Sequence, residues 1–112
     1  MTDADQTDWL TVPDLVELLG QTPSRIRMLI DDRRLLATRI DGVLKVPSLF
    51  LRDGAPLPEL HGTAIVLADA GFTDAEALEW LLGEEGSLGT TPIAALRAGR
   101  KSEVRRVAQA LA

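Results

Sequence analysis

The sequence contains no cysteine and a single histidine, His61. Without cysteine the chain has no disulfide, no thiol nucleophile and no cysteine-ligated zinc. A metal site at His61 would need carboxylates at ligand-like spacing, and the sequence offers none. His61 also lacks a recognisable partner base or nucleophile, so a capping or surface role fits it best. We therefore expect no enzyme activity, no catalytic residue, no metal and no cofactor.

Long apolar runs are also missing, because no stretch approaches the roughly 20 residues that a membrane span needs. The first residues, Met1 to Asp5, have neither the basic region nor the apolar region of a signal peptide. We therefore expect a cytoplasmic protein without membrane contact. No heptad run indicates a coiled-coil dimer, which favours a monomer. The 112 residues, 46% hydrophobic and 26% charged, fit one compact globular unit.

The charges are unevenly distributed along the chain. The formal net charge is −5, yet residues 21–52 carry seven bases against three acids, and residues 93–112 carry five bases against one acid. Residues 1–20 and 53–92 contain only acids among their charged residues. Salt screens charges beyond about 8–10 Å, so a local basic face can bind an anion despite the negative total.

The first half of the chain predicts two helices separated by a tight turn. We expect residues 1–8 to form a disordered acidic tail. An apolar stripe with helical spacing then follows Thr11 and ends at Gly20, and it consists of Val12, Leu15, Val16 and Leu19. Thr22 and Pro23 suit the N-cap and first position of a second helix, predicted over residues 23–32. This outline is typical of a helix-turn-helix.

A hairpin follows the two helices. Residues 35–40 and 43–46 are short runs with strand propensity, joined by Asp41-Gly42, a strong hairpin turn signal. Pro47 should end the second strand. Two helices and a hairpin in this order describe a winged helix over residues 9–52.

The second half, residues 53–112, reads as a helical region packed on the winged helix. A turn-rich linker over residues 53–58 precedes four predicted helices. Thr73 and Glu76 form a capping box for the second of these helices, and Ser102 is the expected cap of the last. The predicted fold is mainly α with a small β-hairpin: a winged helix-turn-helix followed by a helical C-terminal bundle.

Exposed polar and basic residues mark a candidate DNA-binding surface. Arginine can donate two hydrogen bonds to guanine, serine can bond a phosphate or a base edge, and cations on a wing can reach phosphates. The candidate residues are Ser24, Arg25, Arg27 and Met28 on the second helix, Arg33 and Arg34 after it, and Arg39 and Lys45 on the wing. Asp31 and Asp32 oppose this interpretation, unless they pair with Arg27 or with Arg33 and Arg34.

Two further features bear on partners. A second basic cluster, comprising Arg97, Arg100, Lys101, Arg105 and Arg106, could extend the DNA surface, contact a protein, or only balance the acidic segment before it. Thr2 and Thr7 lie in the acidic tail, where a kinase could phosphorylate them. A phosphate there would add about −1.5 to −2 charge and compete with DNA for the basic face.

The segment "LTVPDLVELLGQTPSRIRMLIDDRRLLATRIDGVLKVPSLF" resembles winged-helix DNA-binding domains of the MerR and excisionase type. From residue 9 onward the chain is similar to a small actinobacterial family of winged-helix DNA-binding proteins linked to serine/threonine kinase signalling. The segments that carry this likeness are "DLVELLG", "LLATRIDGVLKVP", "LADAGFTDAEALEWL" and "EVRRVAQALA". The resemblance implies DNA binding without enzyme activity, a Ser/Thr kinase as partner, and DNA contacts from the helix at Ser24 and the wing Arg39–Lys45.

The C-terminal stretch "ALEWLLGEEGSLGTTPIAALRAGRKSEVRRVAQAL" is also similar to the toxin-binding domain of Xre/MbcA/ParS-type antitoxins. The sequence thus predicts a double-stranded DNA-binding protein that regulates transcription. The alternative is a protein-binding adaptor or antitoxin-like module that acts through the C-terminal helices.

Overall fold

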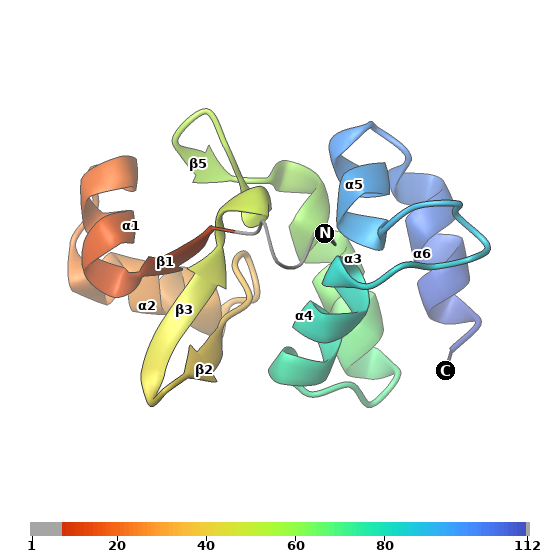
Figure 1. Cartoon of the computed structure of the whole chain (residues 1–112), viewed down its shortest axis with the longest axis horizontal. Coiled ribbons are helices and arrows are strands. Elements are labelled where there is room, and N and C mark those ends of the chain that lie inside the picture. Colours follow the sequence, from red (N-terminus) through yellow and green to blue (C-terminus); the bar gives the residue numbers. More distant parts are fainter. Residues whose placement is uncertain (1–7, 112) are drawn as a thin grey trace.

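The computed structural model describes residues 8–111 and confirms the predicted fold class, mostly helical with small antiparallel sheets. The winged-helix elements form the left half of Figure 1, and the helices α3 to α6 form the right half. No helix in this part of the chain is long and apolar enough to cross a membrane. The elements are β1 (Trp9–Thr11), α1 (Val12–Leu19), α2 (Pro23–Asp31), β2 (Thr38–Ile40), β3 (Val43–Pro47), a 3₁₀ helix (Ser48–Phe50), β4 (Leu51–Arg52), β5 (Ala55–Pro56), α3 (Pro58–Asp69), α4 (Asp74–Leu82), α5 (Pro92–Arg97) and α6 (Lys101–Gln109).

Local sequence signals set the ends of α1 and α2. Thr11 caps α1: its hydroxyl accepts from the Asp14 backbone N–H, and the Asp14 carboxylate accepts from the Thr11 N–H. Gly20 ends α1 in the left-handed conformation, at φ 64°, where a side chain would be strained. Thr22 caps α2 two residues later, because its hydroxyl accepts from the Arg25 N–H. Only residues 20–22 connect α1 to α2, so the two helices stay close together in space.

The wing is the antiparallel pair of β2 and β3, and Asp41 and Gly42 both take positive φ at its turn. The first strand is shorter than the predicted run, because residues 35–37 are buried as irregular chain and the strand begins at Thr38. The sequence interpretation missed β1. Trp9–Thr11 pairs with β3 and makes a three-stranded sheet in the order β1-β3-β2.

Two further predictions are wrong. The expected linker over residues 53–58 contains the turn and second strand of a small hairpin, in which β4 pairs with β5 around Asp53 and Gly54. Ser102 does not cap the last helix, because α6 already begins at Lys101 and its N-cap residue is Arg100, which makes no side-chain capping bond. By contrast, the capping box of Thr73 and Glu76 at the start of α4 is confirmed.

Two arginines join the winged helix to the helical region. The Nη1 of Arg97, at the end of α5, donates to the carbonyls of Leu49 at 2.9 Å and Leu51 at 2.7 Å. In return the Nη2 of Arg52 donates to the Arg97 carbonyl at 2.7 Å, and its Nη1 lies 3.6 Å from the Glu59 carboxylate. We call this set of contacts the arginine exchange. It adds directional bonds to one hydrophobic core that extends from Leu15 in α1 to Ala108 in α6.

We predict that Arg97→Ala destabilises the protein by roughly 2–3 kcal/mol, because two half-buried carbonyls lose a charged donor. Urea denaturation would measure the change. Lys101→Ala is the matched control, since Lys101 is an exposed cation nearby, and we expect it to change stability by less than about 0.5 kcal/mol. Equal midpoints for Arg97→Ala and the wild type would contradict this role of Arg97.

The capping boxes predict an acid dependence of stability. Hydrogen bonds from the backbone of Thr11 and Thr73 lower the pKa of Asp14 and Glu76 respectively. Because folding lowers both pKa values, the stabilisation is present at neutral pH and is lost as the pH falls below about 4. Thermal melts from pH 7 to pH 3 should therefore show a smaller loss of Tm for Glu76→Gln than for the wild type. Thr73→Ser retains the capping hydroxyl and should keep the wild-type pH dependence.

Candidate nucleic-acid interface

The outer face of α2 carries the predicted recognition residues. Ile26 and Leu29 are buried, which fixes the rotation of the helix in the core. Ser24 and Met28, one turn apart, then lie at the centre of the exposed face, and Met28 retains 51% of its surface. Arg25 and Arg27 are exposed on the two flanks of this face. The exposed Asp31, four residues after Arg27, belongs to the same face, so the two cations flank a hydroxyl, an apolar and a carboxylate side chain.

Arg25 lies beside the β4–β5 hairpin, which the sequence analysis did not predict. It lines a hollow of about 140 Å³ together with Gln21 in the α1–α2 turn and residues 54–56 of the β4–β5 hairpin. In Figure 1 this hairpin and the wing lie at opposite ends of the winged-helix half. Asp53-Gly54 is the same turn signal as Asp41-Gly42, so a second hairpin could have been predicted from it.

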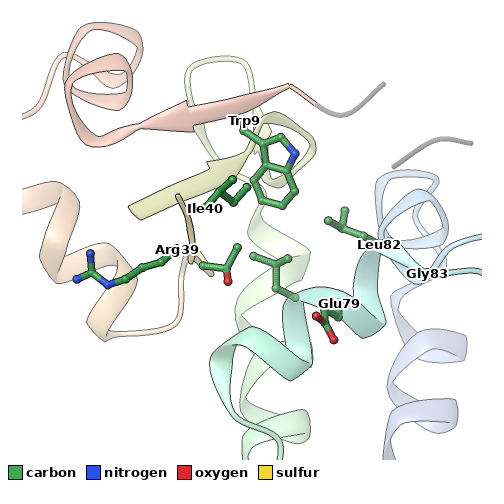
Figure 2. Close-up of a pocket in the computed structure, with 8 residues that line it drawn as sticks. Trp9, Arg39, Ile40, Glu79, Leu82 and Gly83 are labelled. Atoms are coloured by element: carbon green, nitrogen blue, oxygen red, sulfur yellow. The ribbon is translucent and has the colours of Figure 1, made fainter. Parts of the chain in front are cut away.

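The two cations of the wing lie on opposite faces of the sheet. Arg39 pairs with Leu44, whereas Lys45 pairs with Thr38 and Thr11, and paired residues project to the same side. Arg39 is exposed, donates to the Gly42 carbonyl at 3.3 Å, and points away from the groove beside α4 (Figure 2). Lys45 is half-buried. The pKa of Asp14 is lowered first by the Thr11 backbone hydrogen bond and, to a smaller extent, by the Lys45 charge.

The structure separates the two arginines that follow α2. Arg34 is exposed, but the Nε of Arg33 lies 3.3 Å from Oδ1 of Asp74 at the start of α4. Arg33 is therefore directed toward the helical region and away from the exposed face of α2. Within residues 8–111, neither Asp31 nor Asp32 forms an ion pair with Arg27, Arg33 or Arg34. The pairing that would have removed their opposition to DNA binding is therefore not formed within these residues.

The second basic cluster is largely used inside the fold. Arg97 belongs to the arginine exchange, and Arg100 donates to Glu103 and to the Leu88 carbonyl. Its contact with Glu103 raises the pKa of Arg100 and lowers that of Glu103. The Arg105 guanidinium lies over the backbone of Gly62 in α3. Only Lys101 and Arg106 of the five remain fully exposed.

An apolar groove separates the wing from α4 (Figure 2). It encloses about 430 Å³, and its lining includes Trp9, Ile40 and Leu82, with Glu79 and Gly83 at α4. Trp9 and Ile40 come from the winged helix, whereas the others come from the helical region. The indole of Trp9 packs against the hydrophobic core and stays partly exposed to this groove.

The remaining candidates give no chemical site. Thr2 and Thr7 lie outside the described residues. No group of three or more metal-ligating side chains occurs in residues 8–111. His61 is half-buried, and its Nδ1 lies 3.3 Å from the Arg33 carbonyl, so the residue contributes to the junction between the two regions.

Two family models match this chain. Residues 2–51 match the family described as DNA-binding protein Rv2175c, wHTH domain, and residues 57–112 match the Rv2175c C-terminal domain of unknown function. The DNA-binding protein Rv2175c of Mycobacterium tuberculosis (strain ATCC 25618 / H37Rv) is 32% identical over 114 residues, which cover 90% of this chain and 78% of that protein. The NMR structure of Rv2175c superposes with a TM-score of 0.85 at 30% identity, over 94% of this chain and 81% of that one.

The predicted winged helix-turn-helix is confirmed by these matches. The predicted links to kinase signalling and to antitoxin domains stay predictions. The chain belongs to the Rv2175c family, with a winged helix-turn-helix domain of the DNA-binding type followed by a C-terminal domain of unknown function.

Proposed function

We propose that this protein binds double-stranded DNA and regulates transcription, with α2 as the recognition helix. One observation carries the proposal: α2 exposes Ser24 and Met28 between Arg25 and Arg27. In residues 8–111 no carboxylate forms an ion pair with either arginine. Cations that are not neutralised within the protein are available to displace counterions from DNA phosphates. Membership in a family whose winged-helix domain is described as DNA-binding supports the same conclusion.

Within this proposal we give the candidate residues different tasks, according to where they lie. Arg25, Arg27 and Arg34 lie where they would bind phosphates and fix the position of the protein, which gives affinity without reading the sequence. Ser24 and Met28 occupy the middle of the face, where a recognition helix meets base edges in the major groove. The Met28 side chain is suited to apolar contact with a thymine methyl group. Arg39 extends the surface from the wing.

Lys45 has the weaker claim of the two wing cations. It projects from the other face of the sheet and sits near the carboxylate of Asp14. A duplex lying against α2 and Arg39 would leave Lys45 on the far side of the wing. We therefore keep Arg39 in the proposed DNA interface and use Lys45 as the control cation, whose removal should affect DNA binding less.

The alternative is a protein-binding module that acts through the C-terminal helices. The second basic cluster is one surface that could contact such a partner, and two of its five bases, Arg97 and Arg100, form hydrogen bonds within the chain. A kinase acting on Thr2 or Thr7 would regulate DNA binding, because the added phosphate would compete with DNA phosphates for the basic face.

We predict that Arg27→Ala weakens binding to a random-sequence duplex and lowers the slope of log K against log salt by about 1, as expected for one lost phosphate contact. A DNA-shift titration at several salt concentrations would measure both quantities. Retention of the wild-type affinity and slope by Arg27→Ala would contradict a DNA-facing α2.

We also predict that Arg39→Ala reduces the salt slope more than Lys45→Ala does, because the two cations lie on opposite faces of the wing. The two variants remove the same charge from neighbouring strands, so each serves as the control for the other. A larger effect of Lys45→Ala would mean that DNA lies against the face of the sheet that Lys45 shares with Trp9.

A further inference from the structure

Arg33 is the point at which the recognition helix meets the region of unknown function. Its backbone has φ 59°, in the left-handed conformation. Helices commonly end in this way, but usually with glycine, because a Cβ costs about 1–2 kcal/mol there. The conformation closes the end of α2: the Arg34 N–H donates to the Leu29 carbonyl at 2.9 Å, and the Leu35 N–H donates to the same carbonyl at 3.2 Å.

Both polar ends of Arg33 contact the helical region. Its carbonyl lies 3.3 Å from Nδ1 of His61 in α3, and its Nε lies 3.3 Å from Oδ1 of Asp74 in α4. The Nε is shielded from solvent, and the contact with Asp74 is an ion pair rather than a well-aligned hydrogen bond. Two helices of the C-terminal region therefore contact one residue, Arg33, which directly follows Asp32, the C-cap of α2.

We propose that His61 and Asp74 act as a brace on Arg33, so that the C-terminal region positions the recognition helix for DNA. This inference rests on the proposed function of α2. The proposal gives the C-terminal region a structural function, the positioning of α2, for which this region needs to bind no ligand. It also changes the role of Arg33 from a phosphate contact, as the sequence predicted, to a positioning residue.

Asp74 could affect DNA binding through its negative charge alone or by holding Arg33, and these two roles predict opposite effects of Asp74→Asn. If Asp74 acted only through its charge, its removal would reduce repulsion from DNA and tighten binding. If Asp74 holds Arg33, its removal loosens the end of α2 and weakens binding, for which we expect about fivefold, in the lower range of measured couplings. The salt slope should stay unchanged, because no phosphate contact is removed.

The experiment compares Asp74→Asn, Arg33→Gly and the double variant in a salt-dependent DNA-shift titration. Arg33→Gly removes the side chain and at the same time relieves the left-handed backbone, so this variant should fold. The double variant should bind no more weakly than Arg33→Gly alone, because both changes remove the same contact. Asp69→Asn is the matched control, since it removes an exposed acid elsewhere in the region.

Several outcomes would overturn the brace. Tighter or unchanged binding by Asp74→Asn would do so, as would additive effects in the double variant. A salt slope lowered by about 1 in Arg33→Gly would restore Arg33 as a phosphate contact.

A second measurement needs no DNA. Amide hydrogen exchange at Arg34 and Leu35 reports the closing bonds of α2, and Asp74→Asn should accelerate it severalfold, whereas Asp69→Asn should not. Unchanged exchange would contradict the brace even if DNA affinity fell. If the wild type bound no DNA, the proposed function would fail, while the exchange result would still decide whether Asp74 holds the end of α2.

Discussion

The arginine exchange is the constraint on which the arrangement of the two regions depends. Arg97 reaches from α5 to the carbonyls of Leu49 and Leu51, where the winged helix ends and the chain turns into β4. These carbonyls lie in a half-buried junction, where an unpaired acceptor is costly. Because Arg52 returns a bond to the Arg97 carbonyl, an arginine side chain from each region binds the backbone of the other. These directional bonds add to the shared hydrophobic core, which packs the helices of the C-terminal region against the winged helix.

The local signals of the chain were sufficient to predict most of its helices and the wing. Thr11, Gly20, Thr22 and the pair Thr73 and Glu76 act within a few residues of their own position, so their effect can be read from a single sequence. Strand β1 could not be predicted in this way, because Trp9–Thr11 is a strand only through its pairing with β3, some 35 residues later. The strand predicted over residues 35–40 began too early. Residues 35–37 have strand propensity, but they are buried in the core as irregular chain.

The candidate site was predictable to a similar extent and for a similar reason. Helical spacing correctly placed Ser24 and Met28 on the exposed face of α2, because Ile26 and Leu29 must be buried. Spacing says nothing about partners that are distant in sequence. In the sequence, Arg33, Arg97 and Arg100 look like Arg27, as basic residues within basic segments. In the structure, Arg33 contacts Asp74, Arg97 donates to backbone carbonyls, and Arg100 donates to Glu103. A basic residue therefore becomes a candidate contact only after its internal partners are known.

The packing of Arg105 on Gly62 has a consequence for how this family can change over time. Glycine inside a helix costs about 1 kcal/mol relative to alanine, and Gly62 lies in the middle of α3. A Cβ at this position would overlap the Arg105 guanidinium, so the missing side chain makes room for the arginine of α6. Because the guanidinium is the far end of a flexible side chain, it can turn away from α3 in a relative that replaces this glycine, at the loss of this contact. A larger residue at position 62 is therefore expected to weaken the packing of α6 on α3, although its partner lies 43 positions further along the chain.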